Sequence, residues 1–428
     1  MYFSVMDWTH LLNLEFPQLP LDAEDEAVLK KLAKNLQDNY PYHSPDYAGQ
    51  MIKPPLPIAQ AAHWMTSFIN PNNHALDGGR ATSALELETI GALGSMVGYS
   101  KPLGHLTSGG TTANLEALWV ARQSNTNTIV LANEHAHYTH SRMSEVLGIP
   151  FQAISSTENG AMNLLILRDV LEKLQSKGIK ATIVATLGTT GMGAVDTLAD
   201  ILPTARAYGA RIHVDAAYGV YFTLADLSKE AQRHFTAMDS ADSIVIDPHK
   251  HGLQPYECGA VLFKNPEEGR FYKHDSPYTY FTSDQLHLGE ITLECSRAGA
   301  AAAALWATQQ KFPYVRSGNF AQRLNESLEA AQGLKNTLIA QGWWVLEPEL
   351  DICVFSLSGL KASEISAKNR MFFEQKAEEN IHLALFSLSQ QNCPLEMEWD
   401  VFSLTVVSSV LMKPEHNDPA LCERIARI

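Results

Sequence analysis

Residues 180–219 read KATIVATLGTTGMGAVDTLADILPTARAYGARIHVDAAYG and decide the fold class. Two short apolar runs, 182–185 and 211–214, flank a segment with helical character at 198–208. The runs are rich in β-branched residues and do not alternate strictly between apolar and polar residues, which is typical of strands covered on both faces. This order of strand, helix and strand predicts an α/β fold with a mainly parallel sheet.

The same alternation extends over much of the chain. Further strands are expected at 128–132, 151–154, 243–246 and 258–263, with helices at 84–97, 115–123, 140–148 and 168–177. Towards the C-terminus we expect helices at 298–310 and 320–341 and strands at 343–346, 352–357 and 402–407. The sequence therefore predicts an N-terminal helical arm (1–60, ending in a proline-rich link), a large domain (61–310) and a small C-terminal α/β domain (311–428).

The composition restricts the class of protein. The 428 residues include 32 Lys and Arg against 47 Asp and Glu, which gives a net charge of −15 and argues against nucleic acid or an anionic membrane as partner. No apolar stretch reaches the roughly 20 residues of a membrane-spanning helix, and the N-terminus does not resemble a secretory signal. Five widely spaced cysteines without a CxxC pair fit a reducing cytosol. We therefore expect a cytoplasmic protein.

Polar and ionisable residues follow several of the expected strands. Asp215 comes directly after 211–214, and the tetrapeptide 247–250 (DPHK) brings Lys250 after 243–246. Thr186 follows 182–185, and His137 lies shortly after 128–132. Ligands of an open parallel sheet bind at the carboxyl ends of its strands. Each residue alone is equally explained by a solvated loop or a structural ion pair, but together they predict a site at one edge of the sheet.

Residues 104–114, GHLTSGGTTAN, run into the helix expected at 115–123. Small residues before a helix allow backbone N–H groups to face an anion. The segment is neither a Walker A loop nor a GxGxxG fingerprint, and no strand-to-glycine turn with an acid about 20 residues further on is clear. A plain helix cap explains it as well as a phosphate site does.

Five motifs in order carry a family resemblance: 107–114 (TSGGTTAN), 137–139 (HYT), 185–190 (ATLGTT), 213–218 (HVDAAY) and 247–250 (DPHK). Together they resemble the group II pyridoxal-phosphate-dependent decarboxylases, a family that includes glutamate, aromatic amino acid, histidine and archaeal tyrosine/aspartate decarboxylases, with sphingosine-phosphate lyases as relatives. The resemblance implies the aspartate-aminotransferase-like fold (fold type I), pyridoxal 5'-phosphate (PLP) as cofactor, and a homodimer with active sites at the interface.

The resemblance also implies roles for single residues. Lys250 forms the internal aldimine with the cofactor, Asp215 pairs with the pyridine nitrogen, and His137 stacks above the ring. The remaining cofactor contacts that it implies are Ala217 below the ring, Thr186 at the exocyclic oxygen, and Gly110, Thr111 and His249 at the phosphate.

The substrate side departs from the family pattern. Asn73, His74 and Arg80 lie in a stretch that resembles the family's substrate-side segment, and Arg297 belongs to a Ser-Arg element of the lyase and archaeal branch. Arg80 suits an acidic substrate or a surface ion pair. In the glutamate and aromatic branches a mobile loop supplies a tyrosine that reprotonates the product, but residues 281–293 contain none. Tyr278 and His287 are our candidates for that role, with Tyr280 as a further one.

We therefore expect decarboxylation of an L-amino acid to an amine and CO₂. The alternatives are a decarboxylation-dependent oxidation, a carbon–carbon lyase of the sphingosine-phosphate type or an aminotransferase on the same fold, and a cofactor-bound protein without activity. We expect no metal, although the spacing of His135, His137 and His140 leaves an imidazole metal site as a minor alternative.

Overall fold

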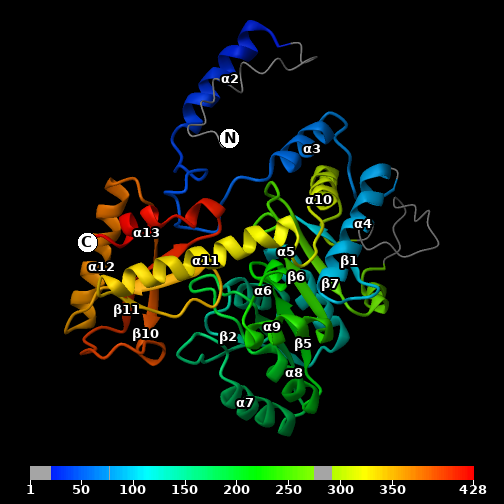
Figure 1. The fold of residues 1–428 in the computed structure, drawn as a ribbon. Helices are drawn as coiled ribbons and strands as arrows, with labels where there is room; N and C mark the ends of the chain where they lie inside the picture. Colours follow the sequence, from blue (N-terminus) through cyan, green and yellow to red (C-terminus); the bar gives the residue numbers. More distant parts are fainter. Residues whose placement is uncertain (1–20, 77, 274–291) are drawn as a thin grey trace.

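The computed structural model describes residues 21–76, 78–273 and 292–428. A seven-stranded sheet lies at its centre, and the C-terminal elements form a second sheet beside it (Figure 1). The central sheet consists of β1 (Leu103–Thr107), β2 (Thr128–Asn133), β3 (Phe151–Ile154), β4 (Lys180–Thr186), β5 (Arg211–Asp215), β6 (Ser243–Ile246) and β7 (Gly259–Phe263). The second sheet consists of β8 (Trp344–Val345), β9 (Ile352–Ser356), β10 (Ala384–Ser389) and β11 (Ser403–Val410).

The helices precede, connect and follow these strands. In the N-terminal half they are α2 (Ala23–Leu36), α3 (Pro57–Ser67), α4 (Arg80–Met96), α5 (Gly110–Ser124), α6 (Thr139–Leu147), α7 (Leu164–Ser176) and α8 (Leu198–Ala207). In the C-terminal half they are α9 (Lys229–Thr236), α10 (Gly299–Lys311), α11 (Asn319–Ala340), α12 (Ala362–Glu378) and α13 (Pro419–Ala426).

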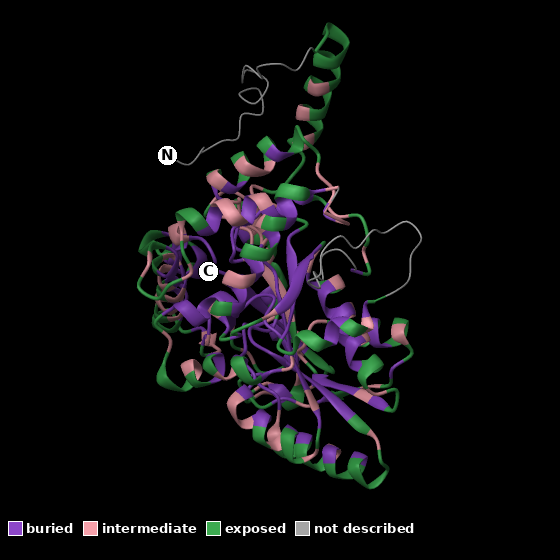
Figure 2. Cartoon of the chain, turned by 90° about the vertical axis from the view of Figure 1, so that its right-hand side faces the viewer, coloured by how far each residue is buried: buried purple, intermediate pink, exposed green. Residues whose placement is uncertain are grey.

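The strand order of the central sheet is β1-β7-β6-β5-β4-β2-β3. Every neighbouring pair from β6 to β3 is parallel, whereas β7 is antiparallel to both β1 and β6. Figure 2 shows that the strands at the centre of the molecule are largely buried. Strands β6 (SIVI) and β7 (GAVLF) are buried throughout, which is the physical reason that they carry almost only apolar residues. The prediction of an α/β fold with a mainly parallel sheet is confirmed.

Several elements were not predicted. Strand β1 lies directly before Gly109 and Gly110 and was not predicted from the sequence. The sequence LGHLT has little β-branched character, and its assignment as a strand depends on its pairing with β7. Helix α5 begins at Gly110 rather than near Leu115. Helix α12 and strand β10 in the C-terminal part were also missed.

The buried core extends across the boundary predicted at residue 310. One apolar cluster joins residues of the central sheet such as Ile212 with residues of the C-terminal part such as Phe320 and Val354. A second cluster fills the space between α11, α12 and the C-terminal sheet. The division at residues 60 and 310 therefore stays a prediction. Among the described residues, no helix is both long and apolar enough to cross a membrane.

Candidate active site

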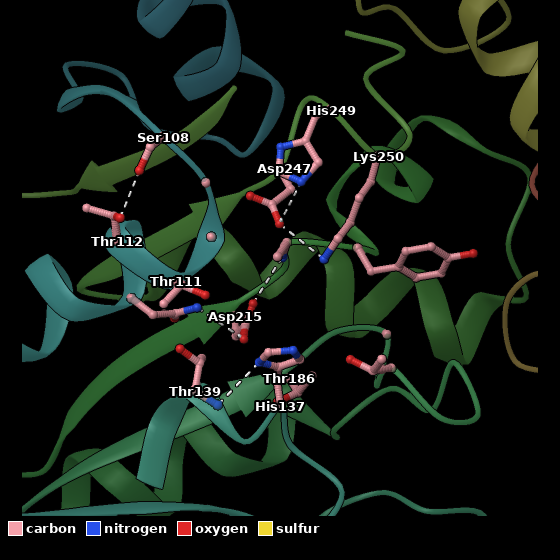
Figure 3. A pocket seen from close by; sticks show the side chains of 17 residues that line it. Ser108, Thr111, Thr112, His137, Thr139, Thr186, Asp215, Asp247, His249 and Lys250 are labelled. Atoms are coloured by element: carbon pink, nitrogen blue, oxygen red, sulfur yellow. Dashed lines mark hydrogen bonds and ion pairs between the residues drawn. The ribbon is translucent and has the colours of Figure 1, made fainter. Parts of the chain in front are cut away.

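The residues predicted to bind the cofactor surround one cavity at the carboxyl edge of the central sheet. Its volume is about 270 Å³. Figure 3 shows that side chains from separate strand ends and helix termini are directed into it. All of the predicted cofactor residues line it: Gly110, Thr111, His137, Thr186, Asp215, Ala217, His249 and Lys250.

Lys250 lies in the turn that follows β6. Its backbone N–H donates to the carbonyl of Asp247, and its Nζ lies 3.1 Å from Oδ2 of the same residue. Nε2 of His249 lies 3.6 Å from that oxygen, and its Nδ1 contacts the carbonyl of Cys258 at 2.9 Å. Asp247 therefore holds the Lys250 amine near the carboxyl end of β6, where a ligand in the cavity can reach it.

The carboxylate of Asp215 is fixed by three partners. Oδ2 accepts from Nε2 of His140 at 2.8 Å and from Nδ2 of Asn114 at 3.4 Å, and Oδ1 accepts from the backbone N–H of Ala217 at 3.1 Å. Asn114 is in turn held through Oδ1 by Nε2 of His213 at 2.8 Å. Asp215 thus has a single orientation and is ready to meet a positive group in the cavity.

Burial and neighbouring charges set the ionisation of this group. Burial acts to raise the pKa of Asp215, but the hydrogen bond and charge of His140 and the charge of Lys250 outweigh it and hold the pKa below its usual value. Burial lowers the pKa of His213 to about 3, so that this ring is neutral. The site therefore presents an anionic Asp215 at neutral pH.

His137 lies in the loop between β2 and α6. Its Nδ1 accepts a hydrogen bond from the backbone N–H of Thr139 at 3.2 Å. Burial lowers the pKa of His137, which favours the neutral ring. A neutral imidazole with Nδ1 as acceptor carries its proton on Nε2.

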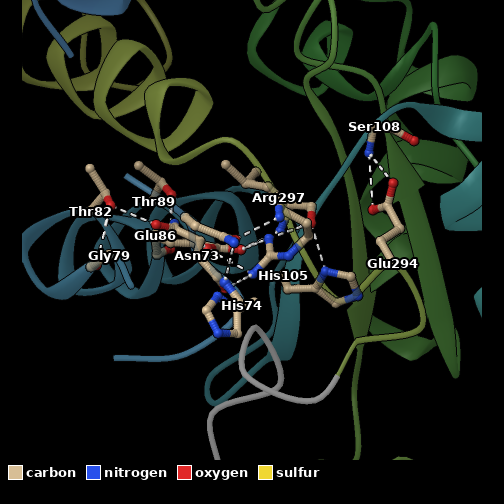
Figure 4. Close-up of polar contacts among 12 residues, drawn as sticks. Asn73, His74, Gly79, Thr82, Glu86, Thr89, His105, Ser108, Glu294 and Arg297 are labelled. Atoms are coloured by element: carbon tan, nitrogen blue, oxygen red, sulfur yellow. Dashed lines mark hydrogen bonds and ion pairs between the residues drawn. The ribbon is translucent and has the colours of Figure 1, made fainter. Parts of the chain in front are cut away.

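The N-terminus of α5 forms one wall of the cavity. A Cβ atom added to Gly110 would lie 2.7 Å from Oδ2 of Asp247, so only glycine fits there. The N–H of Ser108 donates to both oxygens of Glu294 at 3.1 Å (Figure 4). The loop before α5 therefore already offers a backbone donor to an anionic oxygen, as a phosphate site requires.

Thr186 is positioned by an acid that the sequence analysis missed. Asp196 is fully buried and accepts from the backbone N–H groups of Thr186 at 2.7 Å and Met162 at 2.6 Å, and from Nδ2 of Asn133 at 2.8 Å. Burial raises the pKa of Asp196 to about 6 against these donors. This carboxyl group anchors the turn after β4.

The predicted substrate residues that the structure describes do not line this cavity. Nη1 of Arg297 donates to Oε1 of Glu86 at 2.6 Å, and Nη2 donates to the Asn73 carbonyl at 2.9 Å (Figure 4). The structure thus places the Arg297 guanidinium on a buried carboxylate rather than in the cavity. Asn73 donates to the same Glu86 at 2.8 Å. Arg297 therefore joins the segment before α10 to α4.

The other candidates differ in how far the structure describes them. Arg80 begins α4 and is exposed, and His74 lies partly buried in the loop before it. Tyr278, Tyr280 and His287 lie outside the described residues. Their roles stay predictions.

His140, one of the three histidines considered as metal ligands, contacts Asp215 through Nε2. Within the described ranges, the group close enough to hold an ion is Asp200, Glu230 and His234, none of which lines the cavity. Arg233 pairs with Asp200 at 2.8 Å and with Glu230 at 2.6 Å. A guanidinium therefore already supplies the positive charge there.

The cavity fits PLP by its own chemistry. The buried polar atoms Thr139 Oγ1, Thr186 Oγ1 and Asp247 Oδ1 border it without a hydrogen-bond partner among the described residues. Such atoms require partners, which a polar ligand provides. Lys250 offers an amine for an aldehyde, Asp215 an anion for a ring nitrogen, and the start of α5 backbone donors for a phosphate.

Comparison with known proteins agrees with this chemistry. Residues 7–358 match the family model described as "Pyridoxal-dependent decarboxylase conserved domain". The chain belongs to this family. It is therefore a PLP-dependent carboxy-lyase, and PLP is its cofactor.

Relatives of known name support the family assignment. The L-aspartate decarboxylase of Thermococcus kodakarensis is 28% identical over 355 residues, which are 81% of this chain and 88% of that protein. The L-tyrosine decarboxylase of Enterococcus faecium is 27% identical and covers 73% of this chain and 67% of its own length.

Solved structures show the same fold. Oryza sativa TDC with PLP and tryptamine superposes with a TM-score of 0.82 at 15% identity and covers 99% of this chain and 92% of its own. Mouse CSAD gives a TM-score of 0.81 at 18% identity, with 98% of this chain and 91% of its own covered. The predicted aspartate-aminotransferase-like fold is confirmed.

Proposed function

We propose that this enzyme removes the α-carboxylate of an L-amino acid and that Lys250, Asp215 and His137 carry the reaction. The observation that supports this most is the convergence of the Lys250 amine and the Asp215 carboxylate on one cavity from the ends of two neighbouring strands (Figure 3). PLP, when bound, supplies an electron sink for the pair of electrons that the departing carboxylate leaves behind.

Asp215 holds the ring nitrogen in its protonated form. An anion in a buried site raises the pKa of a nearby ring nitrogen by Coulomb attraction, and low dielectric strengthens that attraction. Its contacts with His140, Asn114 and Ala217 keep the carboxylate directed at one point. Ala217 contributes the wall below the ring, because its small side chain lets a flat ligand approach.

When PLP is bound, Lys250 would hold it through its amine, the group that reacts with an aldehyde. Asp247 accepts a contact from this amine at 3.1 Å, so the lysine has a defined position when it is free. His137 holds its mobile proton at Nε2, on the side away from the Thr139 N–H. We assign it to stack on the ring and to orient the substrate carboxylate.

The phosphate contacts are assigned to Gly110, Thr111 and His249, and the contact with the ring oxygen to Thr186. The first turn of α5 presents free N–H groups, since its first residues have no intrahelical acceptor. The Thr186 hydroxyl borders the cavity without another partner among the described residues. Both features favour the assignments.

The substrate is tested with a panel of L-amino acids. L-Aspartate, L-tyrosine and L-2,4-diaminobutyrate come first, because relatives are named for their decarboxylation. Release of CO₂ together with an amine supports the proposal. Formation of a keto acid, or of an aldehyde from a cleaved carbon–carbon bond, instead favours the aminotransferase or lyase alternative.

Substitution of the lysine tests the assignment of Lys250. Lys250→Ala is expected to lose the visible absorbance of lysine-bound cofactor and at least a thousandfold in turnover, roughly what loss of a covalent catalytic group costs. Lys177→Ala, at the end of α7, is the matched control and should behave as wild type. A Lys250→Ala protein with normal turnover contradicts the assignment.

We further propose a cytoplasmic homodimer with active sites at the subunit interface. Helix α2 has no buried residue, yet Val28 and Leu32 are exposed on one side of it, and Trp64, Met65 and Phe68 of the α3 region are exposed as well. Exposed apolar groups of this kind favour a protein partner. The free cysteines fit a reducing compartment.

A further inference from the structure

Asp351, a buried acid of the C-terminal part, contacts two residues that adjoin the active site. Asp351 directly precedes β9 and is fully buried. Its Oδ1 accepts a hydrogen bond from the phenol of Tyr218 at 2.5 Å. Its Oδ2 lies 3.1 Å from Nε2 of His251. One carboxylate thus contacts two segments of the central sheet region.

Both partners of Asp351 adjoin the catalytic groups. Tyr218 follows β5 shortly after Asp215, and its ring lines the cavity. His251 is the residue next to Lys250. The phenol of Tyr218 is bonded to Asp351, so the ring is the part that faces the cavity.

His251 is enclosed by aromatic rings. Its imidazole lies 4.8 Å from the ring of Tyr218 and 4.8 Å from that of Phe222, measured between centroids. Its side chain is fully buried. Tyr218, Phe222 and Asp351 together therefore fix the position of this imidazole. Because His251 is the residue next to Lys250, they also fix the backbone of the Lys250 turn.

The ionic state of Asp351 suits this role. Burial acts to raise its pKa, but the contacts from His251 and Tyr218 and the charge of Lys53 outweigh it and hold the pKa below its usual value. A buried carboxylate is costly unless hydrogen-bonded. The loss of either partner would therefore leave the remaining groups poorly satisfied.

We propose that Asp351 is a positioning residue of the active site, which fixes the cavity wall at Tyr218 and the turn of Lys250 at His251 and so makes cofactor retention depend on the C-terminal part. This rests on the proposed function for the identity of Lys250, and it adds a residue that no sequence motif indicates. A purely structural role for the same ion pair is the alternative to be separated by experiment.

The test compares three single variants and one double variant of the full-length protein loaded with PLP. Asp351→Asn keeps an oxygen for the Tyr218 phenol but removes the charge, and Tyr218→Phe keeps the ring but removes the phenol. Glu268→Gln is the matched control: it also breaks a buried ion pair, with Arg211 at 2.6 Å, and neither partner lines the cavity. The first readout is the rate of cofactor release, followed by absorbance after dilution. The others are the melting temperature and the kcat and KM for the amino acid that the panel identifies as the substrate.

We expect Asp351→Asn to release the cofactor about 10 to 100 times faster, as the loss of a hydrogen bond to a charged group implies. Tyr218→Phe should share this defect, and the double variant should lose less than the sum of the two single effects, because both substitutions act on the contact between Tyr218 and Asp351. Glu268→Gln should lose stability but release the cofactor at the wild-type rate.

Wild-type cofactor release and wild-type kcat in both Asp351→Asn and Tyr218→Phe would overturn the proposal, even with a lower melting temperature. If Asp351→Asn does not fold, Tyr218→Phe decides alone. A wild-type protein that binds PLP but releases no CO₂ from any amino acid contradicts the proposed function and leaves the cofactor-release comparison as the test of Asp351.

Discussion

Asp215 shows how a single residue becomes chemically useful through its surroundings. Alone at the end of β5, a buried carboxylate would favour protonation. The hydrogen bond and charge of His140 and the charge of Lys250 reverse that preference and hold it ionised. Asn114 and the backbone N–H of Ala217 fix its orientation. The groups behind the acid are therefore as important to the site as the acid itself.

The first prediction concerns His140. His140→Ala removes the shortest of these hydrogen bonds to Asp215 and should lower kcat about 10- to 100-fold, the usual effect of losing a hydrogen bond to a charged group. His140→Gln, which keeps an N–H donor, should recover part of the loss. Steady-state kinetics on both variants and on His234→Ala, a buried histidine of α9, measures the effect. Wild-type kcat in His140→Ala would refute it.

Asp196 shows the limit of reading residues one at a time. Its sequence context, Gly-Ala-Val-Asp, carries no sign of function. Its role depends on donors from three separated segments, at Thr186, Met162 and Asn133. Because such contacts are long-range, only the folded chain shows that this acid anchors Thr186.

At the scale of elements, the site depends on how strands end and helices begin. Strands β4, β5 and β6 are parallel neighbours, so Thr186, Asp215 and the Lys250 turn meet at one edge. Helix α5 packs on β6 and β7 and brings its N-terminus to the same edge. A phosphate and a ring can therefore be held at one place by elements of different type.

The second prediction tests the start of α5. Gly110→Ala places a Cβ 2.7 Å from Oδ2 of Asp247, which leaves no room without a shift of the acid that holds Lys250. We expect cofactor affinity to fall at least tenfold, measured by fluorescence titration with PLP.

Gly333→Ala is the control for this substitution. In α11 the added Cβ would make only an ordinary contact, 3.9 Å from Sγ of Cys422. Because alanine favours helix over glycine by about 1 kcal/mol, Gly333→Ala should stabilise the protein by up to that amount without changing affinity. Equal PLP affinity in both variants would contradict the prediction.

At the scale of the whole molecule, helix α2 exposes apolar side chains. Helix α2 projects from the body and buries none of its residues (Figures 1 and 2). A helix with an apolar side and no partner gains little from its own hydrogen bonds in water. We therefore expect its stability to come from a second copy of the chain.

The third prediction follows from the proposed dimer. Val28→Glu together with Leu32→Glu places charges on the apolar side of α2 and should weaken the dimer at least tenfold, measured by analytical ultracentrifugation across a concentration series. Ala27→Glu, on the opposite side of the same helix, is the control and should leave the dimer unchanged. Equal dimer dissociation constants in both variants would remove α2 from the interface.

The fourth prediction concerns pH. Burial lowers the pKa of His213 and of His416 to about 3 from the usual 6.5, so the unfolded chain binds these protons between pH 6.5 and 3 while the folded chain does not. Stability should therefore be lost as the pH falls below about 6.5, by about 1 kcal/mol per histidine and pH unit.

Urea denaturation at several pH values measures this loss. His416→Gln keeps an acceptor for the N–H of Lys413 and removes one of the titrating groups, so its free energy of unfolding should fall less steeply with pH. A slope equal to that of wild type would show that His416 is not the group responsible.

The sequence by itself determined the fold class and the chemistry-bearing residues of the sheet edge. The apolar runs that precede Thr186, Asp215 and Lys250 are local features of the sequence, so they can be recognised without knowledge of the fold. The tertiary structure alone decided what supports them: the strand β1, the donor His140, the anchor Asp196 and the carboxylate of Asp351. These depend on contacts between segments far apart in the chain, whose energies arise only when burial removes the polar groups from water.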